Sequence, residues 1–509
     1  MSASPQKFPS PSAAAQAAIN ATGTFMGYVF MARLNGQVYA DVSYGNAVAA
    51  GAGTPALPMS HNSILHLASC SKVICHAALL AMMEDWQTLA TAIQAGAQGP
   101  TSTVDYYPIL HLPPKPLPTP PPGSPPLPRP TPIKVSVPNW LLPVFSSQSV
   151  AQQFIAAGLT SLAPSLTGTI QGFANGEGTI SSTATIGAQP GFVGLLQQIA
   201  AGVPVPTYNT PFMSLIGQKL QTTAAALNPA LTTPYPYAGG IEPTFTLAQL
   251  LNHQTTLHQG GLSAGILSQI PSANGSQPAG GTCTFNLWPY MVGLMMDYPG
   301  PPGYNNNNYT TLGAVIAECT GMDYGQFTIE RLFNDPRFST IRLGPGPQPE
   351  AYYYGSAPNF GAGVEACNYT NNDFGAGGFF ASSYQFTDWL YALYSCDPTV
   401  KNWNGVGPSL SSANSTLLFD KGTGTFPTDW DLWAAPDSTT GWLLEAKSGG
   451  TGWSAPSGSP SGSANSVIGI AVSPDNKEVM TAFFATNCSY NAWGAWQPGV
   501  TAAIQYYQG

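Results

Sequence analysis

The amino-acid sequence predicts a mixed α/β (α+β) protein in which an antiparallel β-sheet, built from both ends of the chain, is flanked by helices. Hairpin patterns occur at residues 26–45 and 466–487, and helix-forming apolar residues fill 73–84. With 509 residues the chain is long enough for several domains, or for one domain with a large insertion. The simplest packing joins the two hairpins in one sheet and leaves the intervening chain to form covering helices and a second, mainly helical lobe.

The two hairpins are indicated by alternating strand-like runs around turn residues. Residues 26–45 read MGYVFMARLNGQVYADVSYG, in which Asn35-Gly36 suits the positive φ angles of a type I′ turn. Residues 466–487 read SVIGIAVSPDNKEVMTAFFATN, with SPDNKE as the turn between two apolar runs. Each segment therefore predicts two antiparallel strands.

A buried helix is predicted at 73–84, VICHAALLAMME, because these residues are good helix formers and mostly apolar. Ser69 and Lys72 would then occupy its first turn and lie on one face. Further helical patterns occur at 246–253, at 310–321 with Gly321 as the stop, and at 382–395.

A large insertion is predicted between the helix and the second lobe. Residues 113–132 are dominated by proline and predict a semi-rigid polyproline II strap. From Trp140 to Ile241 the only charged residues are Glu177 and Lys219, yet apolar residues recur throughout, which favours a packed insertion and a candidate lid. We expect a sheet-containing α/β lobe (24–85 and 430–509), the strap and apolar insertion (86–240), and a mainly helical lobe (241–429).

The charge composition limits the partners of the protein. Only 7% of residues are charged, far below the roughly 25% of an ordinary soluble domain, and the net charge is -9. Without a basic stripe to neutralise phosphates, nucleic acid is not an expected partner. No apolar run reaches the length of about 18 residues needed to span a membrane. The composition leaves the oligomeric state open.

Composition also favours an extracellular or periplasmic location, with the cytoplasm as the alternative. A surface poor in carboxylates loses little stability in acid. Asn-x-Ser/Thr sequons occur at Asn20, Asn274, Asn308, Asn368, Asn414 and Asn487. The N-terminal 20 residues lack the apolar core of a signal peptide, so we expect that a signal was removed.

Metal and cofactor motifs are not found in the sequence. The seven cysteines are scattered, and neither a Cys-x-x-Cys pair nor a His-Glu-x-x-His motif occurs. The odd number leaves at least one cysteine unpaired within a monomer. We therefore expect no metal site and no cofactor.

Three short motifs carry the chemistry. Ser69 and Lys72 form a Ser-x-x-Lys motif, in which a desolvated lysine can take the serine proton, although an isolated match usually marks a helix cap and a surface charge. Tyr304 and Asn306 stand in a polar loop, GYNNNNY, that leads directly into an apolar helix. Residues 447–449, Lys-Ser-Gly, precede the C-terminal hairpin, where small residues let backbone approach a ligand.

Together and in this order, the motifs resemble those of the serine β-lactamase and penicillin-recognising superfamily, on its class C side with D-alanyl-D-alanine carboxypeptidases and family VIII carboxylesterases. Residues 245–257, FTLAQLLNHQTTL, look like the family segment TL-x-x-LL-x-H-T-S-G-L, and 373–390 resemble its Gly-Gly stretch. The resemblance covers most of 24–85 and 241–505, and 86–240 have no counterpart in it. This chain departs from the family pattern at Cys70, in Tyr-Asn-Asn, and at Gln254-Thr255-Thr256.

The resemblance implies a serine hydrolase with a β-lactamase-like fold and a covalent intermediate. It makes Ser69 the acylated nucleophile and Lys72 its activating partner. Tyr304 would be the general base in acylation or deacylation, with its pKa lowered from about 10 by the ammonium groups of Lys72 and Lys447. Asn306 would position the substrate and Lys72.

The resemblance also implies how the substrate is held. Lys447, Ser448 and Gly449 would bind its polar end, including a carboxylate. The backbone N–H groups of Ser69 and Gly450 would form the oxyanion hole, aimed at the charge that develops during acyl transfer. The substrate would be a small or polymeric ester or amide.

Several alternatives remain beside the favoured carboxylesterase, for which the apolar insertion supplies an acyl pocket. A β-lactamase or a D-amino-acid-specific carboxypeptidase or amidase would use Lys447 to bind a carboxylate. A non-catalytic binding or scaffold protein would be expected to lack one of the motif residues. Ser263, in Gly-Leu-Ser-Ala-Gly, is a rival nucleophile, but no strand pattern precedes it and all six histidines lie upstream, so we expect a loop there.

Overall fold

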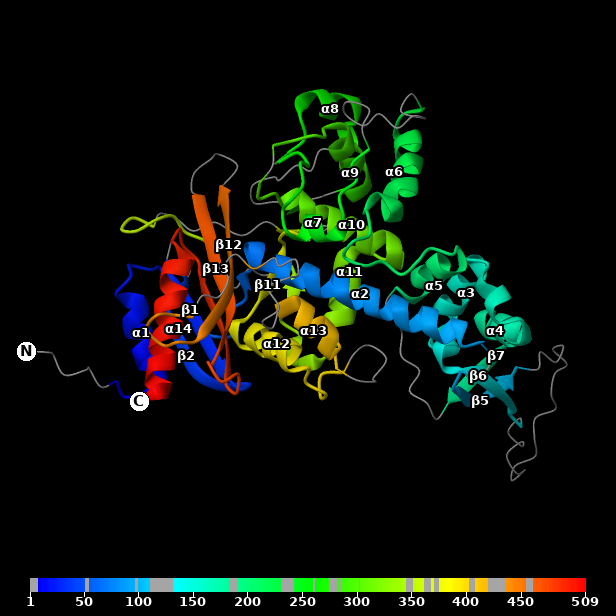
Figure 1. The fold of residues 1–509 in the computed structure, drawn as a ribbon, viewed down its shortest axis with the longest axis horizontal. Helices are drawn as coiled ribbons and strands as arrows, with labels where there is room; N and C mark the ends of the chain where they lie inside the picture. The colour runs from blue at the N-terminus through cyan, green and yellow to red at the C-terminus, as the bar shows by residue number, and fades with distance from the viewer. Residues whose placement is uncertain are drawn as a thin grey trace, which may run out of the picture.

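The computed structural model (Figure 1) describes most of the chain. The described residues are 8–50, 55–96, 99–109, 131–182, 191–229, 242–259, 261–273, 282–283, 286–301, 303–344, 351–360, 368–369, 375–401, 408–419, 430, 436–454 and 461–509. Most of the predicted polyproline strap lies outside them. Among the helices so described, none is long and apolar enough to cross a membrane.

Six of the described strands form one antiparallel sheet in the order β12-β13-β14-β1-β2-β3. The register pairs Tyr28 with Thr486, so the two ends of the chain meet in the middle of the sheet, as predicted. Asn35 and Gly36 have φ angles of 50° and 80°, which confirms the type I′ turn. The bounds are β1 Gly27–Leu34, β2 Gln37–Val48, β3 Leu57–Pro58, β12 Leu443–Ser454, β13 Ser461–Val472 and β14 Val479–Thr486.

Both faces of this sheet are covered by helices. Tyr28, Phe30 and Phe484 face one core with α1 (Pro11–Asn20) and α14 (Ala492–Gln508), two helices that the sequence did not predict. Val29 and Phe483 face the other core, with α12 (Ser383–Ser395) against β1 and β14. The alternation of neighbouring side chains between two cores explains why β1 reads as a nearly continuous apolar run.

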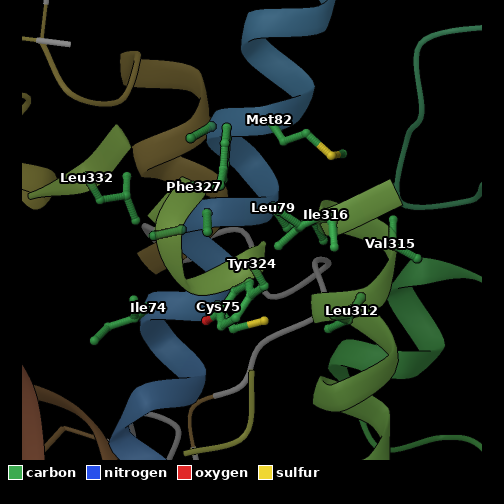
Figure 2. Packing of buried hydrophobic residues seen from close by; sticks show 14 of the residues in the cluster. Ile74, Cys75, Leu79, Met82, Leu312, Val315, Ile316, Tyr324, Phe327 and Leu332 are labelled. Atoms are coloured by element: carbon green, nitrogen blue, oxygen red, sulfur yellow. The ribbon is translucent and has the colours of Figure 1, made fainter. Parts of the chain in front are cut away.

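Helix α2 (Ser71–Gln94) connects the sheet to the rest of the molecule (Figure 1). It begins two residues before the predicted helix and ends ten residues after it, and Ser69 lies in the preceding 3₁₀ turn η1 (Ala68–Cys70). Helices α10 (Asn306–Thr320) and α11 (Tyr324–Leu332) pack against α2 through an apolar cluster that Figure 2 shows. Gly321 ends α10 at a φ angle of 68°, which confirms the predicted stop.

The insertion is a packed structure in its described residues, as predicted. Its strands form a small antiparallel sheet in the order β6-β5-β7, and its helices share the apolar core of α2. However, α5 lies toward the C-terminal end of α2 (Figure 1) and packs against both α2 and α10. The 3₁₀ helix η3 (Asn139–Phe145) also packs on α2. Residues 131–182 and 191–200 thus lie toward the other end of α2 from Ser69, and the candidate lid stays a prediction. The bounds are β5 Thr101–Pro108, β6 Ile133–Pro138, β7 Gly178–Ser182, α3 Gln148–Ala156, α4 Thr167–Ala174, α5 Phe192–Ala200 and α6 Met213–Leu227.

Residues 242–419 are mainly helical where they are described, with a few short strands. Strand β11 pairs with β4 and β9, which places the segment after residue 375 beside the chain that leads to Ser69. Helix α2 runs through the predicted boundary at 85–86, and the three-part domain division stays a prediction. The bounds are β4 Leu65–His66, α7 Leu247–Leu251, α8 Ala264–Gln269, β8 Thr282–Cys283, α9 Leu287–Met296, β9 Arg342–Leu343, β10 Asn368–Tyr369, β11 Phe379–Ala381 and α13 Ser412–Phe419.

Three of the sequon asparagines have buried or hydrogen-bonded side chains. Asn308 and Asn487 are fully buried, and the Nδ2 atom of Asn487 donates to three backbone carbonyls. The Nδ2 atom of Asn414 donates to Leu80 and Glu84. Glycosylation needs an accessible amide nitrogen, so these three positions do not support the sequon argument, and the extracellular or periplasmic location stays a prediction.

Candidate active site

Ser69 stands at the junction of β4, η1 and α2. Ala68, the residue before it, has a φ angle of 47°, a left-handed conformation that is unusual for alanine. The Ala68 N–H donates to Nδ1 of His66 at 3.0 Å, and the Leu67 N–H donates to the Phe379 carbonyl at 2.9 Å. These two bonds hold the turn that presents the half-buried Ser69 side chain.

Lys72 lies one turn along α2 and is fully buried. Its Nζ donates to Ser69 Oγ at 2.9 Å, to Asn306 Oδ1 at 2.8 Å and to the Ala376 carbonyl at 3.1 Å. An ammonium group has three N–H donors, so these three acceptors match its charged form. The lysine therefore joins α2, the first residue of α10 and the segment before β11 around the serine.

Tyr304 comes from the loop before α10. Its hydroxyl lies within hydrogen-bond distance of Ser69 Oγ, at 2.9 Å. Its ring lies near two ammonium groups, with the centroid 5.0 Å from Lys72 Nζ and 5.2 Å from Lys447 Nζ. The tyrosine is 51% exposed, and its ring contacts both lysines.

Strand β12 passes directly beside the serine. Lys447 is 1% exposed, and its carbonyl accepts a bond from Cys70 Sγ at 3.2 Å. A Cβ atom on Gly449 would lie 2.6 Å from the Ser69 nitrogen and 2.8 Å from the Leu67 carbonyl oxygen. Only glycine fits at this position, because any side chain would collide with the turn that carries the nucleophile.

A buried amide network supports the Tyr304 loop from behind. Asn305 Nδ2 donates to the carbonyls of Leu257 and His258, and Asn307 Nδ2 also donates to the His258 carbonyl. Asn308 Oδ1 accepts from the Thr255 hydroxyl. Three of the four consecutive asparagines are therefore buried and tie α10 to the chain after α7, whereas Asn306 is exposed and contacts Lys72.

The structure brings the main predicted residues together. Ser69, Lys72, Tyr304 and Asn306 share hydrogen-bond contacts, and Lys447 contacts the Tyr304 ring. The predicted oxyanion role of the Gly450 N–H stays a prediction, as does the substrate role of Ser448. The loop at Ser263 is confirmed: this residue is exposed, immediately before α8, and its N–H donates to Asp297.

Two functional candidates were missed by sequence reasoning. His66 holds Ala68, and its complete burial lowers the pKa of the imidazole to about 3. His253 contacts the Tyr304 ring, which its place in the segment FTLAQLLNHQTTL does not indicate. Within the described ranges, no three His, Cys, Asp or Glu residues are grouped so that they could hold a metal ion.

Comparisons with known proteins place the chain beside several solved hydrolase structures. No family model matches the sequence, and neither does any curated protein. The chain is similar to a D-stereospecific amidohydrolase from Streptomyces sp., with 12% identity over 97% of this chain and 98% of that one and a TM-score of 0.48. It is similar to the class C β-lactamase from Rhodobacter sphaeroides, with 12% identity over 97% and 99% and a TM-score of 0.47. The D-amino acid amidase from Ochrobactrum anthropi SV3 shows 12% identity over 97% of each chain and a TM-score of 0.45.

Proposed function

We propose that this protein is a serine hydrolase that cleaves an ester or amide through an acyl-enzyme at Ser69. The observation that carries the proposal is the convergence of Lys72 Nζ and the Tyr304 hydroxyl on Ser69 Oγ, each at 2.9 Å. A nucleophilic serine needs a group that takes its proton and a positive charge that stabilises its oxygen, and both are within hydrogen-bond distance.

Tyr304 is the base in this proposal, and Lys72 supplies charge. Lys72 already donates three hydrogen bonds, which suits an ammonium that stabilises the serine oxygen as it attacks. The second ammonium, on Lys447, also lies over the Tyr304 ring. Two nearby positive charges favour the phenolate over the phenol, so Tyr304 can accept the Ser69 proton during attack.

The same groups serve the second half of the reaction. Tyr304 passes the proton to the leaving alcohol or amine to complete acylation. In deacylation it takes a proton from the attacking water and returns it to Ser69 Oγ as the bond between Ser69 Oγ and the acyl carbon breaks. The close approach of Gly449 to the Ser69 nitrogen brings β12 beside that N–H. The Gly450 N–H on the same strand is the second donor that we assign to the oxyanion hole, and Ser448 and Gly449 flank the acyl group.

The favoured substrate is a carboxylic ester. The sequence based this preference on an apolar insertion beside the cleft, but the described insertion lies largely at the other end of α2. Lys447 supplies a different reason, because its side chain is buried and its ammonium contacts the Tyr304 ring. This contact favours a role in holding Tyr304 over the capture of a substrate carboxylate. A β-lactam or a D-amino-acid peptide or amide is the alternative.

The substrate class is tested by comparing kcat/KM for a short-chain p-nitrophenyl ester, a D-amino acid p-nitroanilide and a chromogenic cephalosporin, with Ser69→Ala as the blank. We expect the ester to be the best of the three and all Ser69-dependent turnover to vanish in the blank. Dominant turnover of the cephalosporin would make Lys447 a carboxylate ligand and would contradict the esterase assignment.

A further inference from the structure

His253 lies against the candidate general base. Its ring centroid is 4.3 Å from that of Tyr304, at an interplanar angle of 39°, and 5.3 Å from that of Tyr309. The residue follows α7 with a φ angle of 55°, so a left-handed turn aims the imidazole at the loop that carries Tyr304. The contact of His253 with Tyr304 leads directly to the nucleophile, because the Tyr304 hydroxyl lies 2.9 Å from Ser69 Oγ.

The contacts of His253 fix its tautomer. Its Nδ1 accepts the backbone N–H of Asn305 at 3.1 Å and lies 3.2 Å from Nδ2 of Asn308. A backbone N–H can only donate, so Nδ1 must present its lone pair. The Thr255 hydroxyl bonds Oδ1 of Asn308, which turns the amide nitrogen of Asn308 toward the imidazole. The ring proton of His253 therefore resides on Nε2.

The surroundings also favour a neutral imidazole. An imidazolium would direct an Nδ1–H at the Asn305 N–H, which would break that bond. Lys72 Nζ lies 5.0 Å from the Tyr304 ring centroid and 5.5 Å from that of Tyr309, and these are the two rings that His253 contacts. A further positive charge would oppose Lys72 and Lys447 across the same tyrosine.

We propose that His253 is a positioning residue, a neutral Nε2–H imidazole that holds Tyr304 at Ser69. Its ring supports the Tyr304 ring, and its Nδ1 fixes the backbone of Asn305, the next residue. Tyr304 is 51% exposed, so without this support its side chain could rotate away from Ser69 Oγ. The inference rests on the proposed function, because it concerns how the base of that reaction is oriented.

The test is a double-mutant cycle that joins His253→Asn to Tyr304→Phe. Asparagine tolerates the positive φ angle and keeps an acceptor near the position of Nδ1, but it removes the ring. We expect His253→Asn alone to lower kcat for the p-nitrophenyl ester about tenfold to a hundredfold with little change in KM. In the Tyr304→Phe background the same substitution should change kcat less than about twofold, because its effect passes through Tyr304.

The pH profile of kcat/KM gives a second readout. The groups that face Tyr304 are Lys72, Lys447, Ser69 and His253. If His253 orients Tyr304 among these charges, the part of the kcat/KM pH profile that reports ionisation of Tyr304 should shift by about 0.5 pH unit or more in His253→Asn. An additive loss in the cycle together with an unshifted pH profile would overturn the inference.

The control is His61→Asn, the same substitution at a histidine outside the Tyr304 loop. The His61 imidazole lies 2.7 Å from Asp41, and its ring centroid is 5.8 Å from that of Tyr384. We expect its kcat to stay within about twofold of the unmodified protein. His253→Gln is the second variant if the melting temperature of His253→Asn falls. If the unmodified protein shows no Ser69-dependent turnover, the proposed function itself is refuted. Full turnover in a folded His253 variant would refute only the inference.

Discussion

The two ends of helix α2 differ in what surrounds them. Beside its N-terminus lie buried charges, a left-handed alanine and the buried amides that support the Tyr304 loop. Residues in the C-terminal half of this 24-residue helix pack on apolar side chains of the insertion. At about 1.5 Å per residue the helix is about 36 Å long, so the two environments are well separated.

This difference indicates that one end of the helix serves activity and the other end serves stability. The η1 turn carries backbone strain and the first turn of α2 carries buried charge, which both cost stability and are typical of functional sites. The C-terminal half carries mostly apolar burial, which contributes stability, beside the buried ion pair between Asp85 and Arg331. A substitution at one end should therefore change activity without unfolding the protein, and a substitution at the other end should do the reverse.

The largest expected effect comes from Lys72→Met. Removing the ammonium that bonds Ser69, Asn306 and Ala376 should lower kcat/KM about a thousandfold or more, because the serine loses its stabilising charge. The matched control is Lys134→Met in the insertion, where the exposed ammonium pairs with Asp105 at 3.3 Å. Esterase assays should find the control unchanged. An equal loss of kcat/KM in both variants would contradict the separation of activity from the insertion.

The reverse effect is expected from Phe154→Ala in α3. This side chain is fully buried in the insertion, and the cavity left by its removal should lower the free energy of unfolding by about 3–5 kcal/mol. The kcat of the folded fraction should not change. Denaturant unfolding and esterase assays measure both, with exposed Gln153→Ala on the same helix as control. A kcat loss comparable with that of Lys72→Met would show that the insertion takes part in catalysis.

The smallest effect, counted per pH unit, concerns acid stability and sharpens the comparison at the active-site end. Burial lowers the pKa of His66 to about 3, so between about pH 6.5 and 3 the unfolded chain binds a proton that the native protein does not. The stability due to His66 is present above about pH 6.5 and is lost as pH falls toward 3, by up to about 1.4 kcal/mol per pH unit.

His66→Asn tests this linkage, since asparagine keeps an acceptor for the Ala68 N–H but does not titrate. The free energy of unfolding of the unmodified protein should fall more steeply with acid than that of the variant. Parallel curves from pH 7 to pH 4 would show that His66 does not set this slope.

The sequence predicted the sheet and the main motifs because local patterns specify them. The Asn35-Gly36 turn, the alternating strands and the Gly321 stop are short-range signals, and the structure confirms each of them. The order of the motifs brought Ser69, Lys72, Tyr304 and Asn306 into one hypothesis, and their side chains meet in the fold.

What the sequence did not predict depends on contacts between distant segments. The position of the insertion depends on which end of α2 it packs against, and apolar composition does not specify that. The support of Tyr304 by His253 joins residues 51 positions apart. The strain at Ala68 and its bond to His66 could not be predicted from the sequence either, because nothing in Leu-His-Leu-Ala-Ser indicates a positive φ angle.

The central claim is that Ser69 is the acylated residue, and the most direct measurement is mass spectrometry of the protein after brief reaction with p-nitrophenyl acetate. Peptide mapping should find one acetyl group on Ser69, and Ser69→Ala should carry none. Label on another residue such as Ser263, or undiminished turnover by Ser69→Ala, would contradict the account.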